Sequence, residues 1–177
     1  MKFATHDAPK LRRARRSEPV ILFAVSSRTF AIAAEDVQEI RSTDSLGGTA
    51  VEIVEPLLEK VHHTLERAHR TYYIVNGCVH FGLRISRPTL VLIMRQVRVA
   101  VLVDRIERMS EFSAVYSLPR AFTGAERRWY RGLAYLDDHV IPVVAPTGFL
   151  TPEEFKRLDE QLNRDAARHD LEGAVRA

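Results

Sequence analysis

Two runs, Thr89-Leu-Val-Leu-Ile-Met-Arg95 and Val97-Arg-Val-Ala-Val-Leu-Val103, stand side by side in the middle of this 177-residue sequence. Valine, isoleucine and other bulky apolar residues favour strands. The near-continuous apolar character of both runs predicts two strands that are buried on both faces. Because Arg95 and Gln96 separate the runs, neither is long enough to cross a bilayer. We therefore expect a protein that contains β-sheets and has no membrane insertion.

Shorter β-prone runs lie on both sides of this centre. Most are bounded by polar residues of the kind that form turns, which is typical of hairpins. The first hairpin is predicted from two apolar runs around Ser26-Ser27-Arg28, and the last from two runs around Asp137-Asp138-His139. The predicted strands of this group are Val20–Val25, Thr29–Ala33, Val37–Arg41, Glu111–Leu118, Arg131–Leu136 and Val140–Val144, with a single helical turn at Glu35-Asp36.

The segment between these groups predicts a helix followed by a further hairpin. Apolar residues recur at three- and four-residue spacing over Glu52–His69, which indicates one buried helical stripe. Pro56 places the start of that helix near Glu55. Asn76-Gly77 then separates two short apolar runs, and this dipeptide favours the positive φ angles of a two-residue hairpin turn.

A last helix is predicted from its start signal. Thr151 is a good N-cap, Pro152 suits the first helical position, and Glu154 completes a capping box. Beyond Arg164 we expect the helix to fray. Many short strands with one internal helix and one terminal helix favour small β-barrels over a layered α/β fold.

The net charge of +3 is unevenly distributed. Residues 1–17 hold six basic residues against Asp7, so this segment carries +5 and the rest of the chain −2. We expect residues 1–17 to be a disordered basic arm. Because the basic charge lies in this arm and not in the folded body, it gives no support for nucleic-acid binding by the body itself. The single cysteine, Cys78, excludes a disulfide within the chain and fits a reducing cytoplasm. With 46% hydrophobic and 28% charged residues, the chain has the composition of a globular protein.

Three segments resemble the CheW-like domain of bacterial chemotaxis, in the order that this family has them. They are Leu22 to Arg41 with its Val37-Gln-Glu-Ile-Arg41 end, Thr89 to Asp104, and Arg131-Gly-Leu-Ala-Tyr-Leu-Asp-Asp-His-Val-Ile-Pro-Val143. The resemblance implies a mainly β fold of two intertwined five-stranded, SH3-like barrels. It implies a CheW-like domain over residues 18–150, followed by a helix and frayed tail over residues 151–177.

The resemblance also implies a non-enzymatic adaptor. Such a protein would couple the tip of a methyl-accepting chemoreceptor to the regulatory domain of a CheA-like histidine kinase. On matching positions, Val37 and Glu39 would face the receptor, and Arg70 would be a third member of that surface. The sequence departs from the family in the middle, where Arg70-Thr71 stands in place of Arg-Gly and no Asp-Leu follows. A CheW-like scaffold of another two-component or motility pathway therefore stays an alternative.

Other chemistry has weaker support. Possible metal-binding pairs are His62 with Glu66, Glu59 with His63, and Cys78 with His80, although a polar helix face and a packed strand explain them more simply. We expect no metal, no cofactor and no catalysis, since neither a nucleophile elbow nor a phosphate loop occurs. The basic arm leaves a nucleic-acid binder as an alternative of another class. Trp129-Tyr130 could be an exposed binding anchor or could hold a loop on the barrel.

Overall fold

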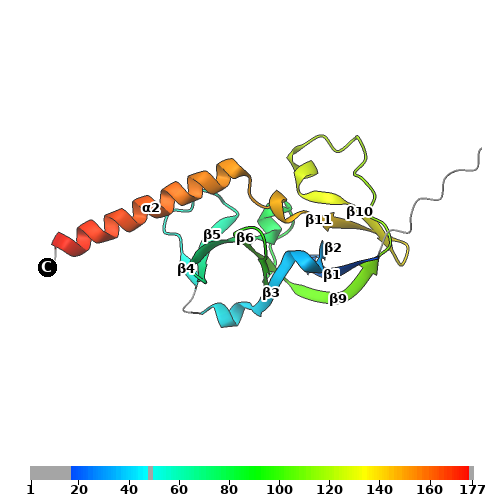
Figure 1. Ribbon diagram of the computed structural model, residues 1–177, viewed down its shortest axis with the longest axis horizontal. Helices are drawn as coiled ribbons and strands as arrows, with labels where there is room; N and C mark the ends of the chain where they lie inside the picture. Colours follow the sequence, from blue (N-terminus) through cyan, green and yellow to red (C-terminus); the bar gives the residue numbers. More distant parts are fainter. Residues whose placement is uncertain (1–16, 48–49, 176–177) are drawn as a thin grey trace, which may run out of the picture.

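The chain forms two curled β-sheets that share a core, with one long helix at the end (Figure 1). The computed structural model describes residues 17–47 and 50–175, and of residues 169–175 it describes the backbone alone. The strands are β1 Glu18–Val25, β2 Arg28–Ala33, β3 Val37–Ser42, β4 Ala50–Glu52, β5 Val61–Arg67, β6 Arg70–Asn76, β7 Leu90–Met94, β8 Val99–Val103, β9 Arg105–Phe112, β10 Tyr130–Leu136 and β11 His139–Val144; the helices are α1 Gly77–His80 and α2 Pro152–Val175, with short 3₁₀ turns η1 Ala34–Asp36, η2 Thr43–Leu46, η3 Ala125–Arg128 and η4 Pro146–Gly148.

One sheet has the strand order β10-β11-β2-β1-β9, and we call it the first barrel. The other has the order β3-β7-β8-β6-β5-β4 and is called the second barrel. The second barrel is therefore an insertion between β2 and β9 of the first. The prediction of a mainly β fold with two SH3-like barrels is confirmed, and the second barrel has six strands where five were expected.

The first strand joins the two barrels because both of its faces are buried. Ile21, Phe23 and Val25 of β1 belong to the largest core cluster, which holds residues of both barrels. Val20 and Leu22, on the other face, belong to a separate cluster inside the first barrel. A third cluster lies in the second barrel. Alternation of side chains along a strand thus lets one strand fill two cores.

The first and the last of the predicted hairpins are confirmed. β1 pairs with β2 across Ser26-Ser27, and β10 pairs with β11 across Asp137-Asp138. The two central runs form the antiparallel pair β7 and β8, and most of their side chains are buried. The strand predicted at Glu111–Leu118 is wrong, because β9 occupies Arg105–Phe112 and only Tyr116 of the later residues forms a bridge, to Leu133.

The helix predicted over Glu52–His69 is wrong. The structure has β4, a loop and β5 in its place, and β5 pairs with β6 around the turn Ala68-His69. Both turn residues have positive φ angles, of 47° and 60°. A register shift between Val61 and His63 breaks the two-residue alternation of β5 and leaves the buried residues at helix-like spacing.

The hairpin predicted at Asn76-Gly77 is also wrong. The Asn76 side chain accepts hydrogen bonds from the backbone N–H groups of Cys78 and Val79, at 3.0 and 3.3 Å, and so caps the short helix α1. A side chain at position 77 would place its Cβ 2.6 Å from the carbonyl oxygen of Leu102, so glycine is required by close packing rather than by a turn. β6 instead pairs with β5 and, in parallel, with β8.

The C-terminal helix begins as expected. The Thr151 N–H donates to the Glu154 carboxylate at 2.8 Å, and the Glu154 N–H donates to the Thr151 hydroxyl at 3.1 Å. The expected fraying beyond Arg164 is wrong, since α2 continues to Val175. The predicted arm lies outside the described residues except for Ser17, so its disorder and the three-part division of the chain stay predictions. No helix of the described part is long and apolar enough to span a membrane.

Candidate partner-binding surface

Glu39 lies where the second barrel closes on itself. It is on β3, at one edge of the sheet, and its carboxylate forms an ion pair with Arg67 of β5. Arg41, two residues along β3, lies 3.6 Å from the same carboxylate. Next to this pair, the Tyr72 hydroxyl of β6 donates to the Gln38 side chain at 3.4 Å. These contacts join β3 to the β5–β6 hairpin although three strands separate β3 from β5 in the sheet.

Arg70 lies at the start of β6, directly opposite Arg67 across the hairpin. Its side chain is exposed, and Arg70 forms no ion pair with the residues whose side chains the structure describes. The structure therefore brings the predicted residues Glu39 and Arg70 to one region through Arg67. We call Glu39, Arg41, Arg67 and Arg70 the Glu39 surface. Arg67 was not predicted from the sequence because it lies in the segment that was incorrectly predicted to be a helix.

Val37 occupies a different environment. It is 7% exposed, faces Met94 across the sheet and belongs to the shared core cluster. A register shift lies between Val37 and Glu39, so the strand turns from the core to the surface at this point. The expected role of Val37 in binding stays a prediction. Its side chain can support the backbone beneath Gln38 and Glu39, but it offers little surface of its own.

The Glu39 surface carries three guanidinium groups and one carboxylate. The side chains of the Glu39 and Arg67 ion pair are 32% and 34% exposed, which leaves them accessible to a partner but partly shielded from water. Arginine presents a planar fork of donors that fits carboxylates well. The arrangement can therefore bind an acidic segment of another protein, and Glu39 holds two of the guanidinium groups in position.

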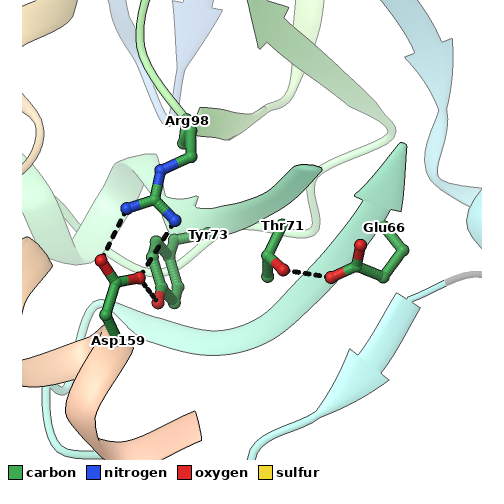
Figure 2. A network of polar contacts seen from close by, with 5 residues as sticks. All are labelled: Glu66, Thr71, Tyr73, Arg98 and Asp159. Carbon is green, nitrogen blue, oxygen red and sulfur yellow. Dashed lines mark hydrogen bonds and ion pairs between the residues drawn. The ribbon is translucent and has the colours of Figure 1, made fainter. Parts of the chain in front are cut away.

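The C-terminal helix is fixed to the second barrel by a half-buried polar network (Figure 2). Arg98 donates two hydrogen bonds to the Asp159 carboxylate, at 3.0 and 2.7 Å, and the Tyr73 hydroxyl donates a third at 2.6 Å. The guanidinium of Arg98 also lies over the rings of Tyr73 and Phe155. Hydrogen bonds from Arg98 lower the pKa of Asp159, whereas burial raises the pKa of Tyr73.

The residue pairs considered as metal ligands do not form the geometry expected of them. The ring Nε2 of His62 lies 2.7 Å from the Glu59 carbonyl oxygen, and β5 replaces the helical face on which these pairs were placed. Cys78 and His80 lie on α1 rather than on a strand, with the Cys78 sulfur 3.1 Å from the Ser86 hydroxyl. Over residues 17–47 and 50–175, no group of three possible metal ligands occurs.

His80 and Trp129 belong to an aromatic cluster. The ring of buried His80 packs against Phe81, Trp129 and Phe149, with centroids 4.6 to 5.0 Å apart. Burial, and then the positive charge of Lys60, lower the pKa of His80 to about 3. Because Trp129 packs in this cluster, it holds the preceding loop on the body, which favours a structural role for Trp129-Tyr130 over that of an exposed binding anchor.

Comparison with known proteins shows the fold. No family model matches the sequence, and no curated protein matches it either. Solved structures do match, among them the crystal structure of the scaffolding protein TtCheW from Thermoanaerobacter tengcongensis. That structure aligns with a TM-score of 0.64 at 15% sequence identity, covering 85% of this chain and 96% of TtCheW. The chain thus has a CheW-like fold, and the resemblance found in the sequence is confirmed at the level of the fold.

Proposed function

We propose that this chain is a non-enzymatic, cytoplasmic adaptor that couples chemoreceptors to a CheA-type histidine kinase. The observation that carries the proposal is the Glu39 surface on a CheW-like fold, because it contains Glu39 and Arg70, two of the three residues that the resemblance assigns to receptor binding. A scaffold must hold two partners at once and needs no reacting group. Two barrels with a shared core supply two faces that keep a fixed relation to each other.

In this proposal the receptor tip binds at the Glu39 surface. Arg70 and Arg67 contact acidic side chains of the receptor, while Glu39 orients Arg67 and Arg41. Val37 contributes indirectly, because its buried side chain supports the backbone of β3 beneath Glu39. The kinase regulatory domain binds other strands of the barrels. The resulting complex transmits the receptor state through the rigid body of the adaptor, without a covalent step.

Calorimetry with purified kinase regulatory domain and receptor tip from the same organism tests the proposal. We expect micromolar binding of the kinase domain to the wild-type chain and to the Glu39→Lys variant. For the receptor tip, we expect Glu39→Lys to weaken binding at least about tenfold, since a loss of about 1.4 kcal/mol is tenfold. The matched control is Glu111→Lys, the same change at an exposed residue of β9.

The alternatives give different results. No kinase binding up to about millimolar concentration would reject kinase coupling. Recovery of a different two-component or motility protein in pull-downs would favour the scaffold of another pathway. A nucleic-acid binder would show a salt-dependent mobility shift that disappears when residues 1–17 are removed. The charge distribution supports this last alternative only for the arm, because residues 18–177 carry a net charge of −2.

A further inference from the structure

A groove beside α2 is not used by the proposed function. It has a volume of about 430 Å³ and lies between the β4 region and the second half of α2. Its lining includes the apolar residues Val51, Val54 and Leu162 and the charged residues Glu52, Glu55, Asp165 and Arg168.

The walls of this groove are apolar and accessible. Val54 is 89% exposed and Val51 is 60% exposed, which is unusual for valine side chains that lie near each other on one surface. Leu162 of α2 is half-buried on the opposite wall. The turn of α2 that carries Leu162 is held in place, because the neighbouring Gln161 side chain donates to the Glu55 carbonyl oxygen at 2.5 Å. This hydrogen bond ties α2 to the segment that forms the facing wall of the groove.

The rim of the groove is acidic. Glu52, Glu55 and Asp165 face one cation, Arg168. Among residues 17–47 and 50–168, whose side chains the structure describes, none of these three carboxylates takes part in an ion pair. A segment that fits must carry an apolar side chain between basic residues. Residues 1–17 have this character: Leu11 is flanked by Lys10 and Arg12, and the segment carries +5.

We propose that the basic arm of one copy of this chain binds the groove beside α2 of a second copy. The arm leads into β1, whose first residue, Glu18, is held by Arg131 of β10 in the first barrel. The groove belongs to the second barrel and α2, at the opposite end of the molecule (Figure 1). The contact joins two different surfaces and is therefore heterologous, so its repetition from copy to copy gives a ring or an open chain.

Sedimentation velocity of the full chain over a range of concentrations tests this proposal at about 50 mM salt. We expect the wild type to associate with rising concentration and to dissociate at about 500 mM salt, where charges beyond a few ångströms are screened. Reversing the charge of the groove with the double substitution Glu52→Lys and Glu55→Lys should raise the dissociation constant for self-association at least about tenfold. Reversal of the arm by Arg12→Glu with Arg13→Glu should do the same.

A charge-swap experiment makes the assignment specific. An equimolar mixture of the arm-reversed and groove-reversed chains should associate again, because each reversed arm then meets a reversed groove. The matched control is Glu35→Lys with Glu111→Lys, which changes the net charge equally at two exposed residues distant from the groove and should associate as the wild type does. Circular dichroism of each variant verifies that it is folded.

Three outcomes would overturn the proposal. They are a wild type that stays monomeric to about 100 μM at low salt, association that persists unchanged in the folded groove-reversed chain, and a swap mixture that stays monomeric. Neither groove nor arm contains a residue of the Glu39 surface. A chain that does not self-associate could therefore still bind the kinase and the receptor. A chain that does not bind them could still self-associate through the arm and the groove.

Discussion

Replacing Asp159 by alanine should weaken the attachment of the C-terminal helix to the second barrel. Asp159 accepts three hydrogen bonds, two from Arg98 and one from Tyr73, and each donor belongs to the barrel. The alanine variant leaves the Tyr73 hydroxyl without its acceptor at the edge of the core. It also leaves a cation over the Tyr73 ring with no carboxylate beside it.

The size of the effect follows from these contacts. A hydrogen bond to a charged group contributes about 1.5–3 kcal/mol. The side chains of Arg98 and Asp159 are 30% and 41% exposed, so water screens their ion pair and it adds only about 0.5 kcal/mol. We expect Asp159→Ala to lower the free energy of unfolding by about 2–3 kcal/mol. Asp159→Asn, which keeps an acceptor for Tyr73, should cost about 1 kcal/mol.

Urea unfolding followed by circular dichroism measures these differences. The matched control is Glu160→Ala, at the next position of α2, where the ion pair is a 4.0 Å contact with Lys156. That variant should stay within about 0.5 kcal/mol of the wild type. A double-mutant cycle of Tyr73→Phe with Asp159→Ala should give a coupling above about 1 kcal/mol. A loss below about 0.5 kcal/mol for Asp159→Ala, or additive effects in the cycle, would refute this account of how the helix is held.

Three further outcomes are expected. The pKa of His80 is about 3 in the folded protein and 6.5 in an unperturbed histidine, so the unfolded chain binds more protons between these pH values. The free energy of unfolding should therefore fall as the pH drops from 6.5, and it should fall less in the His80→Leu variant. Urea unfolding midpoints measured over this pH range test the difference. Glu39→Ala should lower the free energy of unfolding, measured in urea, by less than about 1 kcal/mol, because the side chains of its ion pair with Arg67 are about one-third exposed. A larger loss would mean that this contact is needed to close the second barrel. Thr151→Ala should cost about 1 kcal/mol by removing the cap on α2, and an unchanged melting temperature would contradict the capping box.

The outer hairpins could be predicted because their signals are local. Apolar runs around Ser26-Ser27 and Asp137-Asp138 have no competing interpretation, and the pairing partner is the next strand along the chain. The start of α2 was equally local, since Thr151 and Glu154 satisfy each other's backbone donors. Elements of this kind are specified by a few neighbouring residues and need no tertiary information.

The middle of the chain was predicted wrongly for physical reasons. The irregularity in β5 gives a strand the spacing of a helix, and Ala68-His69 forms a tight turn without the glycine or asparagine that usually marks one. Asn76-Gly77 looks like such a turn but serves as a helix cap and a close-packed position. The partners of β6 include β8, which is distant in sequence. Arg67 of the candidate site depended on this segment and was missed with it.

The insertion of one barrel within the other has a consequence for synthesis on the ribosome. Ala31 of β2 pairs with Val143 of β11, and the residue numbers of the two positions differ by 112. At a synthesis rate of about 5–20 residues per second, roughly 6–22 s pass between the synthesis of Ala31 and that of Val143. During this time β2 has no β11 to pair with. The second barrel, which ends at Val103 of β8, is fully translated before that interval ends, so we expect it to fold first and to cover the inner face of β1 and β2.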